Sequence, residues 1–125
     1  MKFQIRLELG RLASIAFQRR LCVGGTKDEY ILLSEILESA ANTVQTALAS
    51  PVLSRELDGA QLQSLCEFLE VANSTAPKIP FDDGSVSVED LIETNPAWNM
   101  VRVSAQKCLD ALGLRIKLEE LLERS

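Results

Sequence analysis

The sequence predicts an all-α protein, a small antiparallel bundle of four to five helices in a single domain over residues 1–125. Three observations lead to this class. Apolar residues recur at spacings of three and four in several segments, which is the period of an amphipathic helix. Residue types that cap helix starts precede these segments. The chain offers almost no alternating runs that could pair into a sheet. Each apolar stripe must be buried, and a helical bundle buries all of them together.

The N-terminal segment has two interpretations. The apolar residues from Phe3 to Leu9 alternate with charged or polar ones, which is typical of a strand. The same segment also continues in helical register through Leu12 and Ala16. Because a strand would find almost no partner in the rest of the chain, we favour one helix over about residues 2–22. A strand over residues 2–9 remains the alternative.

The clearest helix is expected over residues 26–49. Thr26 followed by Glu29 is a capping box, which satisfies backbone donors at a helix start. Pro51 marks the end of the helix, and residues 51–57 form a connector with room for one helical turn. The apolar stripe of this helix consists of Tyr30, Leu33, Leu37, Ala40, Val44 and Ala47.

A second helix is expected over residues 58–72, with Asp58 as the cap and Gln61 as its partner. Residues 73–86 follow as a long irregular stretch, since two prolines and an Asp-Asp-Gly turn argue against a helix there. The stripe of the second helix consists of Leu62, Leu65, Cys66, Leu69 and Ala72.

The C-terminal part begins with a short helix capped by Ser87, with Asp90 three residues later. Asn95-Pro96 ends it and starts the next helix, because asparagine caps and proline suits the first helical position. Gly113 either caps or kinks that helix, and the leucines beyond it are in a new phase, which predicts a bend. The predicted core contains Leu33, Leu37, Val44, Leu62, Leu65, Leu69, Val101, Cys108 and Leu112.

Charge and hydropathy limit the classes of partner. No apolar run reaches the roughly 20 residues that a membrane-spanning helix needs, and the first ten residues do not resemble a signal peptide. We therefore expect a cytoplasmic protein without a membrane partner. The net charge is −5, and residues 28–93 carry thirteen acids against Arg55 and Lys78. Such a chain repels nucleic acid and suits a basic protein partner, although acids also keep a small domain in solution.

The chain has no histidine, which excludes Ser-His and Cys-His catalysis and most zinc sites. The three cysteines form no C-x-x-C pair, and their apolar neighbours predict buried free thiols. Residues 24–27, Gly-Gly-Thr-Lys, lack the spacing of a phosphate-binding loop.

Acidic pairs and clusters do not match known metal sites either. Two pairs of carboxylates have helical spacing, Glu35 with Glu38 and Glu67 with Glu70, but no histidine is present to complete a di-iron site. We interpret both pairs as parts of solvent-exposed helix faces. The Asp-Asp-Gly turn lacks the spacing of a calcium loop. We expect no metal, no cofactor and no catalytic residue.

The irregular stretch over residues 73–86 is longer than the connections of a compact bundle, which commonly have about 2–8 residues. Together with the short helix that follows, it carries a cluster of acids beside aromatic residues. Ordered long loops on a rigid scaffold tend to carry function, and acids beside aromatic residues suit a basic protein partner. In the alternative reading, Phe81 and Trp98 pack in the core and the acids are only solvated; Trp98 joins the surface only if it is exposed. The candidate partner-binding residues are Asp82, Asp83, Glu89, Asp90, Glu93 and Trp98.

Three short motifs resemble a known family. They are Tyr-Ile-Leu-Leu-Ser at 30–34, Leu-Asp-Gly-Ala-Gln-Leu at 57–62 and Glu-Thr-Asn-Pro at 93–96. The layout is similar to that of the small helical immunity proteins that protect bacteria from type VI secretion effectors. The resemblance implies a non-catalytic inhibitor that binds a cognate toxin and covers its active site. The partners of that family include toxins that act on cytoplasmic nucleotides.

Two other functions remain open. A helical adaptor or secretion chaperone would bind an amphipathic segment of its partner in an apolar groove. An enzyme acting on nucleotides with magnesium would need several carboxylates, such as Glu67 and Glu70, in one pocket. We favour the toxin-binding immunity protein, and we expect the cognate toxin to have a basic contact surface. The adaptor or chaperone is the alternative, and the enzyme has the least support.

Overall fold

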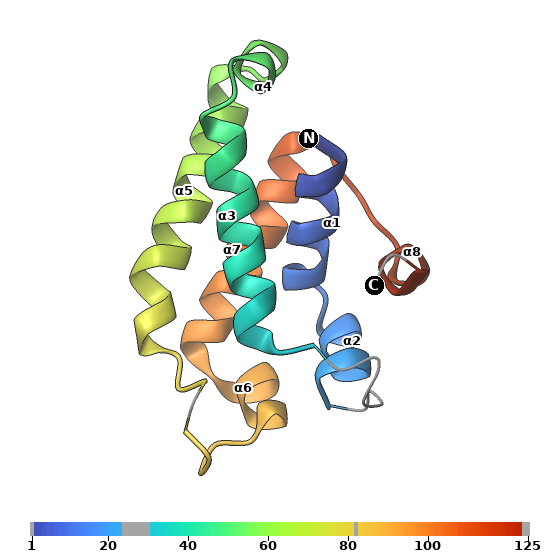
Figure 1. Ribbon diagram of the computed structural model, residues 1–125, viewed down its shortest axis with the longest axis vertical. Coiled ribbons are helices and arrows are strands. Elements are labelled where there is room, and N and C mark those ends of the chain that lie inside the picture. The colour runs from blue at the N-terminus through green and yellow to red at the C-terminus, as the bar shows by residue number, and fades with distance from the viewer. Residues whose placement is uncertain (1, 24–30, 82, 124–125) are drawn as a thin grey trace.

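The computed structural model describes residues 2–23, 31–81 and 83–123, and these ranges contain helices and no strand. The expected all-α class is therefore confirmed. The described ranges hold eight α-helices rather than four or five, because short helices lie between the long ones (Figure 1). The long helices are α1 (Lys2–Ala13), α3 (Leu33–Leu48), α5 (Gly59–Thr75) and α7 (Pro96–Leu112). The short elements are α2 (Ile15–Gln18), a π-helical segment (Arg19–Val23), α4 (Pro51–Glu56), a 3-10 turn (Ala76–Lys78), α6 (Val88–Thr94) and α8 (Leu118–Glu123).

The core lies between the four long helices. Each long helix contacts the next one along the chain, and α7 also contacts α1. Six of the nine predicted core residues are buried, whereas Leu62, Leu69 and Leu112 are partly buried and pack against that core. The six are Leu33, Leu37, Val44, Leu65, Val101 and Cys108.

Local sequence determines several helix ends. Asp58 and Gln61 form the expected reciprocal box, in which the Gln61 amide donates to Asp58 Oδ1 at 2.8 Å. Ser87 Oγ accepts the amide of Asp90 at 3.0 Å and caps α6. Gly113 ends α7 with φ +68°, a left-handed conformation that glycine adopts without steric cost.

The N-terminal segment is helical, so the strand alternative for residues 2–9 is wrong. The expected single helix over residues 2–22 is broken at Ser14, whose Oγ accepts the amide of Phe17 at 3.1 Å and caps α2. The buried Gln18 compensates for the break. Its Nε2 donates to the carbonyls of Arg11 at 3.0 Å and Leu12 at 2.8 Å, at the end of α1.

Two expected boundaries are wrong. The helix expected over residues 26–49 begins at Leu33, because Leu32 is extended and the Ile31 amide donates to the Leu21 carbonyl at 3.1 Å. Residues 24–30, with the capping box and the glycine-rich turn, lie outside the described residues. The irregular stretch expected over residues 73–86 begins later, since α5 continues to the buried Thr75 and the 3-10 turn follows.

Candidate partner-binding surface

The predicted binding segment lies at one end of the molecule, where α6 packs against the π-helical segment and α7 (Figure 1). Its inner side is apolar. Ile79 before the turn and Leu91 and Ile92 in α6 are each buried. Burying a large aliphatic side chain contributes about 1.5–3 kcal/mol, so these three residues hold the segment firmly against the core.

Trp98 belongs to the core and not to the partner-binding surface. Its side chain is completely buried, and its ring meets the edge of Phe81 at a centroid distance of 6.0 Å. The indole Nε1 donates to Gln18 Oε1 at 3.0 Å, which joins α7 to α2. The exposure that Trp98 would need to contact a partner is absent. Its role is to anchor the segment from beneath.

Four acids of the segment are exposed, and we call them the acidic surface: Asp83, Glu89, Asp90 and Glu93. Asp82 lies outside the described residues. Asp83 is ordered by Ser85, whose hydroxyl and amide donate to Asp83 Oδ1 at 2.6 and 2.9 Å. These two hydrogen bonds, the hydroxyl first, lower the pKa of the Asp83 carboxyl because they favour its charged form. Asp83 therefore presents a negative charge in a defined position.

The acids of α6 also interact with their own helix. Glu89 and Asp90 lie in the first turn, where the exposed amides of the helix end favour negative charge. Glu89 and Glu93 are four residues apart, a spacing at which like charges repel mildly. The segment therefore concentrates negative charge at some electrostatic cost, which a basic partner would relieve.

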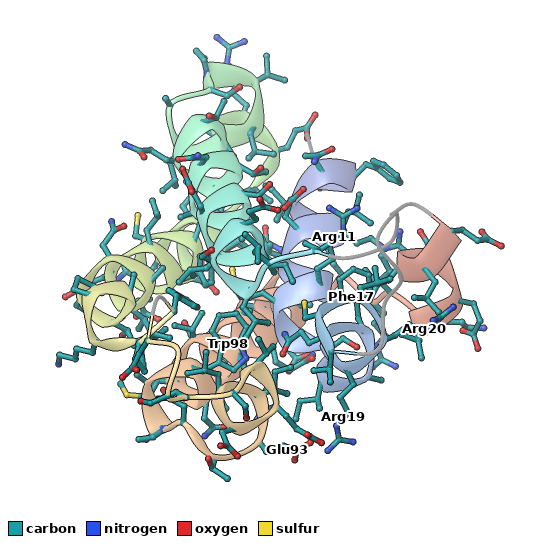
Figure 2. All side chains as sticks on the ribbon, turned by 60° about the horizontal axis from the view of Figure 1, so that its bottom comes forward. Arg11, Phe17, Arg19, Arg20, Glu93 and Trp98 are labelled. Carbon is teal, nitrogen blue, oxygen red and sulfur yellow. The ribbon has the colours of Figure 1, made fainter. Side chains whose placement is uncertain are left out.

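One acid of the surface already has a basic neighbour. Arg19 of the π-helical segment forms an ion pair with Glu93, and Figure 2 shows the two side chains pointing toward one another below Trp98. Arg20 lies farther from Glu93 in the same view. Neither Arg19 nor Gln18 was expected at this site. Their positions inside an N-terminal helix carry no signal for contacts with residues more than 70 positions away.

The other candidate chemistries find no support in the described parts of the chain. The side chains of Glu35, Glu38, Glu67 and Glu70 are exposed. In residues 2–23, 31–81 and 83–123, no three His, Cys, Asp or Glu side chains lie close enough together to hold a metal ion. Over the same ranges, no helix combines the length and the apolar character needed to cross a bilayer.

The cysteines divide into two kinds. Cys22 and Cys108 are buried, and burial raises the thiol pKa of both, that of Cys22 to about 12. Cys66 is exposed, so the expectation that it is a buried thiol on the apolar stripe is wrong. The inner face of α5 is turned toward Phe68, which the predicted stripe left out, and this rotation points Cys66 outward.

The surface thus combines a buried apolar anchor with outward carboxylates. Such an arrangement can bind a basic surface and hold it in a fixed orientation. Comparison of the chain with protein-family models, with curated proteins and with solved structures finds no match.

Proposed function

We propose that this protein is a non-catalytic inhibitor that binds a basic protein toxin through the acidic surface and covers its active site. The observation that carries the proposal is the two-sided construction of α6 and the preceding turn. Ile79, Leu91 and Ile92 are buried on the inner side, while the four carboxylates are exposed. A binding surface benefits from this construction because its charges are held in place before the partner arrives.

The proposed scaffold behind the surface is an antiparallel bundle of α1, α3, α5 and α7. Two features support it. Each of these helices contacts its neighbour along the chain, with α7 returning to α1. Successive long helices also run in opposite directions in Figure 1. Such a bundle is stiff, so the end that carries α6 would meet a partner with little rearrangement.

Electrostatics favours a basic partner. The segments that form the acidic surface belong to residues 28–93, in which acids greatly outnumber bases. A toxin pocket that accepts a phosphate-bearing substrate is itself basic, and complementary potentials accelerate association and orient the complex. The resemblance of three motifs to type VI immunity proteins supports the same class of partner, with the cytoplasm as the proposed place of action.

The proposal of binding rather than catalysis rests on two observations. The chain contains no histidine, and the four carboxylates of the acidic surface are all exposed to water. A catalytic carboxylate usually has its pKa raised by burial or by a like charge close by. The shift at Asp83 is in the opposite direction, toward the charged form.

The test is a charge reversal with a matched control. In the acidic-surface variant, Asp83, Glu89 and Asp90 are changed together to lysine. In the control variant, Glu56, Glu119 and Glu123 are changed to lysine. The control acids are also exposed, but they lie in α4 and α8. Both variants change the net charge equally. The protein used as the partner in this test is the one encoded by the gene next to the gene for this chain.

The acidic-surface variant should lose protection of cells against that partner and weaken binding at least about a hundredfold, which corresponds to about 2.7 kcal/mol. The control should lose little, and wild-type binding should weaken as salt rises. Full protection by the acidic-surface variant would move the interface to another face. Absence of any interaction with the neighbouring gene product would contradict the proposed function itself.

A further inference from the structure

An open groove runs along α5 and α7, on helices that carry none of the acidic surface. Its volume is about 540 Å³. One wall comes from α5 and the other from α7, the two helices with the most extensive mutual contact. We call it the α5–α7 groove, and six of its nine lining residues carry the argument: Glu67, Glu70 and Val71 from α5, and Met100, Val103 and Lys107 from α7.

The groove exposes apolar side chains that the fold leaves uncovered. Met100 is 57% exposed and Val103 37% exposed, one turn apart on the same helix, while Val71 opposite is partly buried. The other large exposed apolar side chains among the described residues lie outside α5 and α7. The methionine side chain is flexible and adapts to different apolar partners, so Met100 is well suited to a reversible binding surface.

The two walls carry opposite charge. All the charged residues of α5 are acids, and Glu67 and Glu70 line the groove, whereas α7 contributes Lys107. None of these three side chains takes part in the ion pairs found among the described residues, and all three are exposed. Their charges are therefore available to an occupant of the groove.

We propose that the α5–α7 groove binds a short amphipathic helix of another protein. The apolar side of that helix would cover Met100, Val103 and Val71, and lysine or arginine on its flank would face Glu67 and Glu70. An acid on the opposite flank would face Lys107, so the charges of the two walls set the direction of the helix. This interaction surface is separate from the acidic surface and does not depend on the proposed inhibitor function.

The spacing of the lining residues indicates the size of the occupant. Glu67, Glu70 and Val71 lie at i, i+3 and i+4 on α5, and Met100, Val103 and Lys107 lie at i, i+3 and i+7 on α7. Seven helical steps cover about 10 Å. A segment of two to three turns, with apolar residues at i, i+3, i+4 and i+7, matches this length and is the usual pattern of a helix bound in a groove.

The experiment uses two synthetic peptides and the full chain. Both peptides are amphipathic helices of about four turns with leucine on one face; the first carries lysine on one flank and the second carries glutamate there. Binding to the isotope-labelled protein is followed by NMR chemical shifts. The lysine peptide should bind at least about tenfold more tightly than the glutamate peptide, a difference of about 1.4 kcal/mol, with shifts concentrated at Val71, Met100 and Val103.

Variants then locate the peptide. Met100→Gln with Val103→Gln keeps the charge of the protein and should weaken the lysine peptide at least about tenfold. Val52→Gln, at an apolar position in α4 that is more exposed than Met100 or Val103, should leave binding unchanged. Glu67→Lys with Glu70→Lys should reverse the preference between the peptides. The acidic-surface variant should bind the lysine peptide with no more than a small loss, which separates this test from that of the inhibitor function.

Several results would overturn the proposal. Equal binding of both peptides, shifts centred on α6, or full binding by the double glutamine variant would each show that the groove is not the site. Sedimentation measurements test a second copy of the chain as the occupant. A dimer that dissociates on Met100→Gln would assign the groove to self-association and reject the proposed partner helix.

Discussion

The two short helices that flank α7 differ in how much of their negative charge is engaged within the fold. α6 precedes α7 and is attached by its buried Leu91 and Ile92 and by the ion pair between Arg19 and Glu93. α8 follows α7 and is attached by its buried Leu121 and through charge: the guanidinium of Arg6 donates to both carboxylate oxygens of Glu120 and to the carbonyl of Arg115. Glu120 and Glu93 are engaged within the fold, whereas the exposed Glu89 and Asp90 take part in none of the ion pairs found among the described residues.

The packing beneath the two segments also differs. Under α6, Trp98 and Phe81 fill the space edge to face. Under the C-terminal segment a pocket of about 470 Å³ remains beside α1, although Gly10 brings the backbone of α1 close to Ile116. A segment held by buried apolar side chains can carry outward charge, because most of that charge takes no part in its attachment.

The largest expected effect is at the anchor of α6. Trp98→Ala should lower the free energy of unfolding by about 3–5 kcal/mol, because it removes a completely buried ring and leaves Gln18 Oε1 without its donor. Urea denaturation measures it. Trp98→Phe keeps the ring contact with Phe81 and should cost about half as much. A loss below about 1 kcal/mol for the alanine variant would show that α6 is not anchored here.

The attachment of the C-terminal segment is tested at Gly10. A Cβ at this position would lie 2.5 Å from Ile116 Cγ2, so Gly10→Ala should cost about 1–3 kcal/mol by overpacking, partly offset by the better helix propensity of alanine. Gly59→Ala is the control, since a Cβ there meets nothing within 4 Å and should be neutral or stabilising. Thermal unfolding compares the two. Equal stability of both variants would mean that the C-terminal segment shifts freely.

Thiol labelling measures how well the packing of α6 shields the buried Cys22 from solvent. Cys66 should react quickly with iodoacetamide, whereas Cys22 and Cys108 should react slowly because both are buried and have a raised thiol pKa. Burial raises the pKa of the Cys22 thiol to about 12, which disfavours the reactive thiolate at neutral pH. Cys22 lies in the segment on which α6 packs, so Trp98→Ala should accelerate its labelling more than that of Cys108. Mass spectrometry of the labelled peptides measures each site, and fast labelling of Cys22 in the native protein would contradict this shielding.

The smallest effect concerns the charge of the acidic surface. Ser85→Ala removes the stronger of the two hydrogen bonds that lower the pKa of Asp83, so that pKa should rise toward the ordinary aspartate value of about 3.9. Because the pKa of Asp83 is lower in the folded than in the unfolded protein, its carboxylate stabilises the fold at pH values above the unfolded-state pKa. This stabilisation is lost as the pH falls through the folded-state pKa. NMR titration of the Asp83 carboxyl measures the shift. Ser87→Ala, which removes the cap of α6 instead, should leave the pKa of Asp83 unchanged.

Much of the local structure follows from short sequence patterns. The Asp58–Gln61 box, the caps at Ser87 and Asn95 and the glycine end of α7 are all present as expected, because each involves residues within a few positions of one another. The exposed acids of α6 were also predicted. The break at Ser14 was not, because a serine within an apolar periodic segment is compatible with a continuous helix until tertiary contacts favour the cap.

The helical class, several helix ends and the concentration of acids between residues 82 and 93 follow from the sequence alone, because these depend on residue type and short spacing. The inward position of Trp98, the outward position of Cys66 and the pairing of Arg19 with Glu93 depend on packing between helices. These outcomes depend on how each helix is rotated about its axis against partners distant in the chain. That rotation follows from the packing of all apolar faces at once, and no single stripe specifies it.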